Sequence, residues 1–538
     1  MSEGGLRHGL GRAIGVLAAL VLALGAAAGS AQARVVLLGI DGASWSVVDP
    51  LLAAGELPEL AALLARGAGA ELETVEPVIS PVVWTSIATG RSPGAHRISG
   101  FASTRLNLAT PTVFERLAAA GLRVGLYDYL VTWPPPALPN GFVAPGWMRR
   151  DARVWPPDLW ERAGVEPYVV DYDGIYSREE HAAGVVQELA RKPPAWLALA
   201  RAFDLDVGAV TIYAVDRACH RFWREAYPAG GGDGPGGPLP REGSLLRRAM
   251  SDLDKGVGAI ARSLGPEDAL LLASDHGFQA GEERHVWVGR TRAHLARAGL
   301  DEERDAFSLI REWSVIVARV HPGPFDARDA VLERLAAFLE SARGPDGEAL
   351  LDVQILDAAP RPPGRRRPLL GRVRQAGFKL AARFLYGARF EDPAHGWVVA
   401  RFEADALERL WPDAAVSLAG ESLRADRLAY RETFDGKHHP TALFIAAGGP
   451  IRHHTERRRL SVLDVAPLLV YLAGQPIPDD LEGHLPRDWI DPAYLAAHPP
   501  GAIAAAAAPR LAPSEAAPTP AVGDSEMLER LRSLGYLE

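Results

Sequence analysis

The chain has 538 residues, of which 48% are hydrophobic and 23% are charged, and these fractions are typical of a soluble globular protein. The formal net charge is −9, and acidic and basic residues are spread along the sequence, which argues against a nucleic-acid polymer as partner. The single cysteine, Cys219, excludes an intrachain disulfide. Stability must therefore come from packing and from any metal that is bound.

The first 33 residues have the layout of a secretory signal peptide. Two arginines, Arg7 and Arg12, precede an apolar run over residues 13–28, and the small-residue sequence Ala31-Gln32-Ala33 follows. This pattern predicts cleavage after Ala33 and a periplasmic or secreted protein. The apolar run is also nearly long enough to span a bilayer, so an uncleaved membrane anchor is the alternative.

The next segment predicts a buried strand that ends in an acidic residue. Residues 35–40 are β-branched and leucine-rich, and Asp41 and Gly42 follow them directly. Such an apolar run is typical of a parallel strand, and open α/β sheets bind ligands at the carboxyl ends of their strands. Asp41 is therefore a candidate site residue. The alternative is a turn residue, as in any strand followed by Asp-Gly.

A hydroxyl group is expected at the start of a short helix. Ser80 precedes Pro81, a pattern typical of an N-cap followed by proline at the first helical position, and Gly90 is placed to end the helix. From the residues alone two roles stay open for Ser80. It only caps the helix, or its alkoxide is favoured by the helix dipole and attacks an anion bound there.

A second strand is predicted to deliver a possible pair of metal ligands. Residues 207–215 precede Asp216, and His220 lies four residues further on. If this segment turns into a helix, both side chains share one face and can close on one ion. A lone pair of this kind is also common by chance.

A third strand has the same character. The apolar run 269–273 predicts a buried strand, and Ser274, Asp275, His276 and Gly277 follow it. Carboxylate and imidazole groups are good ligands for a borderline cation. The alternative is an Asp275 that caps the next helix, beside a surface histidine.

Two adjacent histidines precede a fourth strand. His438 and His439 lead into the apolar run 442–447. One of them is a candidate ligand at the mouth of the sheet, and an exposed loop histidine is the alternative for either.

Composition also indicates how the chain is organised. Residues 34–499 are predicted to form one domain, with insertions at about 111–206 and 284–433 over the carboxyl edge of its sheet. Residues 361–389 are basic and amphipathic, so they can lie on an anionic membrane surface, or form a solvated helix face or a disordered insertion. Residues 500–538 predict an Ala/Pro-rich linker and a short amphipathic C-terminal segment.

Together these signals predict an α/β fold with a doubly wound, mostly parallel sheet sandwiched by helices. The sequence here resembles the alkaline phosphatase superfamily, and most closely its type I phosphodiesterase/nucleotide pyrophosphatase family, over most of residues 35–486. The resemblance is carried by Gly39-Ile40-Asp41-Gly42, Ser80-Pro81 through Thr89-Gly90, Asp216-x-x-x-His220, Ser274-Asp275-His276-Gly277 and Gly436-x-His438.

This resemblance implies an alkaline phosphatase-like metal-dependent phosphoesterase with two divalent metal ions. Zinc suits nitrogen and carboxylate ligands best, and manganese fits the same set. The implied reaction is attack on a small phosphate ester, a phosphoseryl intermediate and its hydrolysis. One ion would be held by Asp41, Asp275 and His276 with the nucleophile Ser80, and the other by Asp216, His220 and His438.

Two departures from related patterns narrow the expected activity. Nucleotide-cleaving members of the family usually have an asparagine some residues after the nucleophile, and residues 81–88 contain none, which weakens the prediction of activity on nucleotides. The sulfatase pattern ahead of Pro-x-Arg is absent, since Pro81-Val82-Val83 follows Ser80. Two other functions stay open: a phosphate or headgroup transferase of the same superfamily, and a non-catalytic metal-binding pseudoenzyme.

Overall fold

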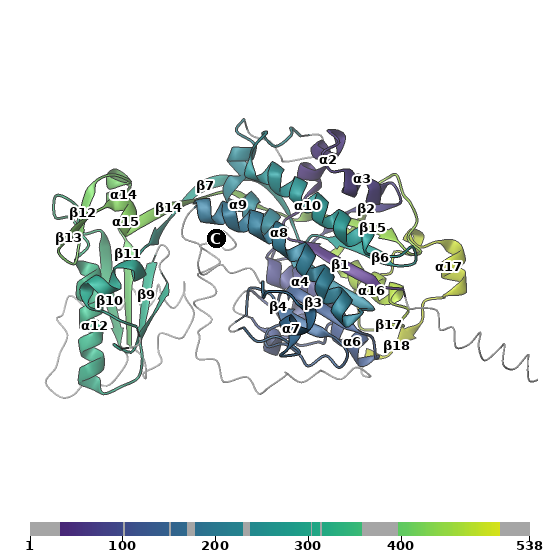
Figure 1. The fold of residues 1–538 in the computed structure, drawn as a ribbon, viewed down its shortest axis with the longest axis horizontal. Helices are drawn as coiled ribbons and strands as arrows, with labels where there is room; N and C mark the ends of the chain where they lie inside the picture. Colours follow the sequence, from purple (N-terminus) through teal and green to yellow (C-terminus); the bar gives the residue numbers. More distant parts are fainter. Residues whose placement is uncertain are drawn as a thin grey trace, which may run out of the picture.

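The computed structural model describes residues 33–100, 103–149, 152–168, 178–229, 237–302, 304–311, 315–357 and 396–505. Its larger body is built on an eight-stranded sheet with the strand order β16-β2-β15-β6-β1-β5-β3-β4 (Figure 1). The strands are β1 (Val35–Ile40), β2 (Gly67–Glu73), β3 (Val124–Tyr129), β4 (Phe142–Pro145), β5 (Val207–Ile212), β6 (Ala269–Ala273), β15 (Thr441–Gly448) and β16 (Arg458–Ser461).

Parallel pairing in the centre of the sheet aligns the strand ends. β1 pairs in parallel with β5 and with β6, and the last residue of β1, Ile40, lies opposite Ile212, the last residue of β5. β15 runs antiparallel to both of its neighbours, β2 and β6. The carboxyl ends of β6, β1 and β5 and the start of β15 therefore lie at one edge.

Helices cover both faces of this sheet. Alternate residues of β1 point to opposite sides, so that Leu37 lies in one apolar core and Leu38 in the other. This arrangement confirms the predicted α/β fold. The first core includes α4 (Ser80–Thr89), α6 (Val113–Ala119) and α16 (Val465–Leu472), and the second includes α2 (Trp45–Ala53), α3 (Pro58–Leu64), α8 (Arg178–Phe203), α9 (Ala214–Ala226) and α10 (Leu245–Arg262).

Shorter elements complete the larger body. They are α5 (Pro93–His96), α7 (Leu159–Ala163), α17 (Pro492–Ala497) and the parallel pair β17 (Ile477–Pro478) and β18 (Ala502–Ile503).

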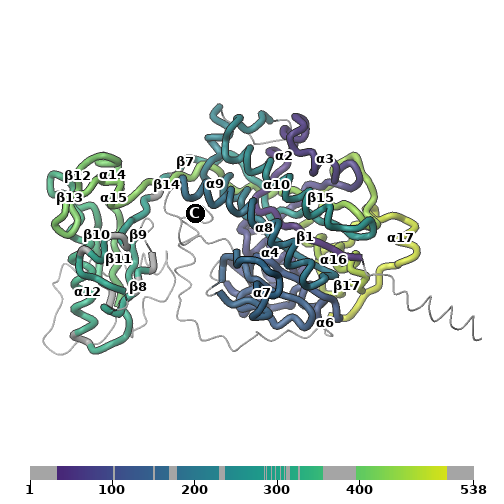
Figure 2. The backbone as a smooth tube through the Cα atoms, in the orientation of Figure 1, coloured from purple at the N-terminus to yellow at the C-terminus, as the bar shows by residue number. Residues whose placement is uncertain are grey.

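A second α/β unit is joined to the first by a long antiparallel ribbon of β7 (Gly277–Gly289) and β14 (Ala429–His439) (Figure 2). Its four-stranded antiparallel sheet has the order β10-β11-β9-β8, and it has an apolar core of its own. The elements are β8 (Phe307–Arg311), β9 (Val315–Val320), β10 (Leu351–Asp357), β11 (Gly396–Phe402), α11 (Arg292–Leu295), α12 (Phe325–Glu340), α14 (Ala404–Leu410), α15 (Ala425–Leu428) and the hairpin β12 (Ala415–Leu418) and β13 (Glu421–Arg424).

The two predicted insertions differ in kind. The first predicted insertion, residues 111–206, contributes β3 and β4 to the central sheet. These two strands are therefore part of the sheet and do not cover its carboxyl edge. The described residues between 284 and 433 form part of the ribbon and the second unit, which stands beside the larger body (Figure 1).

Three predicted segments fall outside the described residues: residues 1–32 of the signal peptide, the basic segment 361–389, and the chain from residue 506 onward. In the part of the chain that the structure describes, no helix combines the length and the apolar character needed to cross a bilayer.

Candidate metal centre

The carboxyl edge of the sheet brings together the three predicted acidic residues. Asp41 follows β1 directly, Asp275 lies just beyond β6, and Asp216 lies in the first turn of α9, the helix after β5. Because β6, β1 and β5 are parallel neighbours, these carboxyl groups meet. Each of the three residues is at most 1% exposed.

The ribbon brings two histidines to the same edge. His276 immediately precedes β7, and His438 lies near the end of β14, opposite Phe278. In an antiparallel ladder the start of one strand lies beside the end of its partner. Residues far apart in the sequence therefore become neighbours, and the two imidazole rings stack with their centroids 3.6 Å apart.

The first donor set consists of Asp41, Asp275 and His276, with Ser80 beside it. Nε2 of His276 lies 3.4 Å from Asp41 Oδ1 and 3.3 Å from Asp275 Oδ2. Ser80 Oγ lies 3.5 Å from Asp41 Oδ1 and 3.4 Å from Nε2 of His276. The structure thus brings together the four residues that were predicted for one ion.

The second donor set consists of Asp216, His220 and His438. Asp216 Oδ1 lies 3.3 Å from Nε2 of His220 and 3.6 Å from Nε2 of His438. The two Nε2 atoms are 3.1 Å apart. The sets adjoin, because Nε2 of His276 is 4.0 Å from Asp216 Oδ1.

These spacings fit divalent metal ions. Two ligand atoms that are each about 2.0–2.1 Å from one tetrahedral ion lie roughly 3.3 Å from each other. In both sets the separations that involve an imidazole nitrogen run from 3.1 to 3.6 Å, and all ligand atoms of a set lie within 4.8 Å of one another. The donors are carboxylate oxygens and imidazole nitrogens, the groups that bind zinc and manganese.

The imidazole rings of His438 and His276 are each oriented by a hydrogen bond at Nδ1, the ring nitrogen that does not belong to the donor set. Nδ1 of His438 lies 2.9 Å from the carbonyl oxygen of Val78, and Nδ1 of His276 lies 3.2 Å from that of Gly277. A carbonyl oxygen can only accept, so Nδ1 carries the proton and Nε2 keeps its lone pair for a metal.

His439, the other candidate at this position, is engaged elsewhere. Its Nδ1 accepts a hydrogen bond of 3.1 Å from the backbone N–H of Thr441, and it belongs to neither donor set. The geometry therefore favours His438 over His439 as the ligand.

Burial sets the protonation of the site. It raises the pKa of Asp41 well above its ordinary value, and the charges of Asp275 and Asp216 raise it further; burial and then Asp216 likewise raise the pKa of Asp275. Burial lowers the pKa of His220 to about 4 and that of His276 well below its ordinary value. His220 and His276 are therefore neutral at neutral pH, and a bound cation would offset the repulsion of Asp41 by the other two carboxylates.

Metal binding is accordingly expected to tighten as the pH rises and to release protons. The raised pKa values mean that Asp41 and Asp275 hold protons longer than exposed carboxyl groups do, and a cation must displace them. Calorimetric titration of metal-free protein with zinc, at several pH values and in buffers of different ionisation enthalpy, measures both effects. A pH-independent affinity without proton release would contradict the assignment.

The sequence matches a family model over a region that contains every residue of the two donor sets except His438. Residues 35–396 match the sequence model of the family described as "Type I phosphodiesterase / nucleotide pyrophosphatase", which is more than half of the chain. The chain belongs to that family. The resemblance predicted from the motifs is thereby confirmed, and no curated protein matches the chain.

Several solved structures of phosphodiesterases and hydrolases are similar to this family member. Murine ectonucleotide pyrophosphatase/phosphodiesterase 5 is 16% identical, with 85% of this chain and 100% of that chain covered and a TM-score of 0.36. Phosphonoacetate hydrolase from Sinorhizobium meliloti 1021, in complex with phosphonoformate, is 17% identical, with 82% of this chain and 96% of that chain covered and a TM-score of 0.38. The human ectonucleotide pyrophosphatase/phosphodiesterase 5 is 15% identical, with 82% and 95% covered and a TM-score of 0.35.

In this phosphodiesterase-family chain the helix that carries Ser80 begins one residue earlier than predicted. Ile79 is the N-cap, Ser80 is the first helical residue and Pro81 follows within the first turn. The prediction that Ser80 caps the helix is therefore wrong, and the structure shows no side-chain cap hydrogen bond at this end. The hydroxyl group instead faces Asp41 and His276.

The other hydroxyl groups of α4 are bound within the fold. Thr85 Oγ1 donates to the carbonyl oxygen of Pro81 at 2.6 Å. Ser86 Oγ lies 3.0 Å from Nε2 of the buried His96, which follows in α5. Thr89 Oγ1 donates to the carbonyl oxygen of Thr85 at 2.7 Å. None of these three hydroxyl groups is placed to replace Ser80.

Sequence reasoning missed two residues that shape the first donor set. Trp84 Nε1 donates to Asp41 Oδ2 at 2.9 Å. Trp84 follows Ser80 by four residues on the same helix, so the sequence already placed both side chains on one helix face. Gly42 has a φ of 75°, and a Cβ there would lie 2.8 Å from the ring of Phe278 and 2.9 Å from Cα of Asp216. This glycine lets the chain turn tightly beneath the site.

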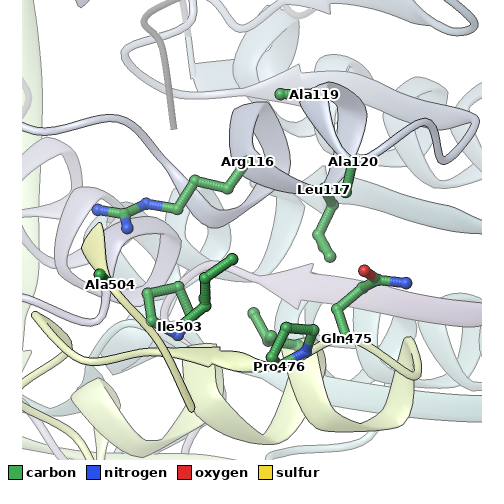
Figure 3. A pocket seen from close by; sticks show the side chains of 10 residues that line it. Arg116, Leu117, Ala119, Ala120, Gln475, Pro476, Ile503 and Ala504 are labelled. Atoms are coloured by element: carbon green, nitrogen blue, oxygen red, sulfur yellow. The ribbon is translucent and has the colours of Figure 1, made fainter. Parts of the chain in front are cut away.

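A separate pocket is lined largely by apolar side chains (Figure 3). It has a volume of about 230 Å³ and lies between α6, the segment that follows α16, and β18. Leu117, Pro476 and Ile503 are among its lining residues. None of the predicted site residues lines it, so it is distinct from the proposed reaction site.

Proposed function

We propose that the protein is a two-metal phosphoesterase, a phosphodiesterase or phosphomonoesterase, that hydrolyses a small phosphate ester through a phosphoseryl intermediate on Ser80. The observation that carries this proposal is the placement of Ser80 Oγ within 3.5 Å of Asp41 and His276, beside a second complete donor set. Membership of the type I phosphodiesterase family supports the reaction class.

Each part of the site has a distinct role in this proposal. Asp41, Asp275 and His276 would hold one divalent ion, and the second set would hold another. Two such ions supply a lower pKa for the serine hydroxyl, neutralisation of the phosphoryl oxygens and stabilisation of the leaving oxygen. Zinc is the proposed metal, and manganese is the alternative.

The chain's own groups then carry out a double displacement. Ser80 Oγ gives up its proton and attacks phosphorus, the bond between phosphorus and the ester oxygen breaks, the departing oxygen takes up a proton and leaves as the alcohol, and a serine phosphate ester remains. Water then attacks phosphorus, so that phosphate or a phosphate monoester departs and Ser80 regains its proton. Ser80 is also the first residue of α4, where the helix dipole favours the negative charge of the phosphoryl oxygens.

We also infer that the enzyme acts outside the cytoplasm, on the basis of residues 1–33. The backbone nitrogen of Arg34 lies 2.7 Å from Asp268 Oδ1, so cleavage after Ala33 would leave a new ammonium group beside a carboxylate. Sequencing the amino terminus of the mature protein tests the cleavage, and a mature chain that keeps residues 1–33 would contradict it and favour the uncleaved anchor. Enzyme found in the cytoplasmic fraction of the cells would contradict the inferred location.

The experiment that tests the function is hydrolysis of bis(p-nitrophenyl) phosphate and p-nitrophenyl phosphate by full-length protein with added zinc or manganese. Metal-dependent release of p-nitrophenol from at least one ester is expected, and a chelator should abolish it. No turnover by metal-loaded protein on these esters or on a broad phosphoester panel would favour a metal-binding pseudoenzyme. Product that forms only when an acceptor alcohol is supplied would favour a transferase.

A further inference from the structure

Behind the second donor set the protein interior holds four charged side chains that the proposed reaction does not use. Asp128, Glu188 and Lys192 are 0% exposed, and Arg217 is 2% exposed. They come from β3, α8 and α9, and their two negative and two positive formal charges balance. A buried charge is costly to desolvate unless it is paired and hydrogen-bonded, so each member depends on the others.

Lys192 is the centre of this buried charge network. Its Nζ lies 2.7 Å from Asp128 Oδ2 and 2.6 Å from Glu188 Oε1, and it donates to the carbonyl oxygen of Thr211 at 2.8 Å. These contacts use all three donors of the ammonium group. One side chain of α8 thus joins β3 to the end of β5.

Glu188 extends the buried charge network to the start of α9. Its Oε1 accepts a hydrogen bond of 2.6 Å from the backbone N–H of Tyr213, the N-cap residue of α9, and its Oε2 lies 3.4 Å from Nη1 of Arg217. A carboxylate at this position satisfies a free N–H group and is favoured by the helix dipole. Asp216 and His220 lie within the next two turns of α9, so this end of the helix sets their positions.

Asp128 lies at an irregular point of β3, where the pairing with β4 shifts register between Tyr127 and Tyr129. Its φ of 56° is rare for a residue other than glycine, and such a conformation persists only where its surroundings fix it. Its carbonyl oxygen accepts a hydrogen bond from the Tyr213 hydroxyl group. The neighbouring Tyr129 hydroxyl donates to the carbonyl oxygen of Trp84 at 2.8 Å, so this point of β3 contacts both α9 and α4.

We propose that Glu188 and Lys192 are positioning residues that fix the start of α9 relative to the nucleophile helix α4. They thereby hold Asp216 and His220 at ligand distance for the second ion. This inference rests on the proposed function, because it supplies the structural cause of the second donor set. If these residues only stabilised the fold, their replacement would not weaken the binding of one ion and spare the other. Apolar replacement of a buried ion pair is also often neutral for stability.

The test compares two double variants of the full-length protein that make the same chemical change. Glu188→Met with Lys192→Met removes the link to α9 and keeps the charge balance of the network. Arg105→Met with Glu115→Met removes a comparably buried ion pair, 9% and 4% exposed, at α6 on the other face of the sheet. The affinity for each zinc ion, the thermal midpoint, kcat and KM are measured for both variants and for the wild type.

The first double variant is expected to bind the second ion roughly tenfold or more weakly, with an unchanged affinity for the first ion and a lower kcat. Glu188→Gln keeps the acceptor for the Tyr213 N–H group, so this single variant should retain most of the wild-type affinity for the second ion. The Arg105/Glu115 variant should bind both ions as the wild type does. Unchanged affinity for the second ion in the first variant, or an equal loss in both variants, would overturn the inference and leave the proposed function intact.

A milder variant decides the question even if the double variant does not fold. Tyr213→Phe removes only the hydroxyl group that binds the Asp128 carbonyl oxygen and keeps the aromatic packing. It is expected to weaken binding of the second ion roughly two- to tenfold, without an effect on the first. Wild-type affinity for both ions would overturn the inference. A wild-type chain that binds no pair of ions would overturn the proposed function as well.

Discussion

Replacing Ser80 by alanine is expected to lower turnover by roughly 10³-fold or more while the fold and most metal binding remain. Ser80 Oγ lies next to Asp41 and His276, so the variant lacks the attacking group and one donor near the first ion. Its side chain makes no cap hydrogen bond, and alanine suits a helix. The free energy of unfolding should therefore change by less than about 1 kcal/mol. Hydrolysis of bis(p-nitrophenyl) phosphate at saturating metal, with circular dichroism as a folding check, measures both quantities.

Thr85→Ala is the matched control on the same helix. The Thr85 hydroxyl donates to the Pro81 carbonyl oxygen, and it lies more than one helical turn, roughly 7 Å, further along the axis than Ser80. This variant should keep near wild-type turnover. If Ser80→Ala keeps near-full activity while Thr85→Ala abolishes it in folded, metal-loaded protein, Ser80 is not the nucleophile.

Asp216→Ala and His438→Ala are each expected to lower the metal content toward one ion per chain. Both side chains belong to the second donor set, with Asp216 Oδ1 3.6 Å from Nε2 of His438. Because both variants disrupt the same site, the double variant should lose little more metal than either single variant. Elemental analysis after extensive dialysis measures the zinc or manganese content.

His439→Ala is the control for the second donor set. His439 is adjacent to His438 in the sequence, but its Nδ1 accepts from Thr441 N–H. Two ions per chain are expected to remain in this variant. Retention of both ions in Asp216→Ala and in His438→Ala would show that the ligand assignment is wrong.

The parts of the site that lie on parallel strands could be predicted from the sequence. The apolar runs at 35–40 and 269–273 are buried strands, and Asp41 and Asp275 lie at their carboxyl ends. Asp216 and His220 share one helix, as their spacing of four residues predicts. In these segments local periodicity and tertiary position agree, because each strand is buried on both faces.

Contacts between distant segments could not be read in this way. His438 precedes β15, as expected, but it also lies inside β14, whose pairing with β7 places it beside His276. The antiparallel direction of β15 likewise depends on its neighbours in the sheet. The choice between His438 and His439 follows from backbone partners that no local pattern reveals.

Two helices contain proline residues in their interior, which in a sequence usually indicate the end of a helix. α8 continues through Pro193 and Pro194, and α2 contains Pro50, although proline in a helix interior removes a hydrogen bond and usually ends the helix. Burial of apolar side chains from both helices against the sheet offsets that loss. Glu188 and Lys192, which belong to α8, were therefore not recognised from the sequence.

The most direct test is to trap the phosphorylated enzyme during turnover. Full-length protein with zinc and bis(p-nitrophenyl) phosphate is quenched in acid at successive times, and its peptides are mapped by mass spectrometry. Phosphate is expected on Ser80 in the wild type, with none on this peptide in Ser80→Ala. Full turnover with no phosphate on Ser80 at any quench time, or phosphate on a different hydroxyl group, would contradict the proposed reaction.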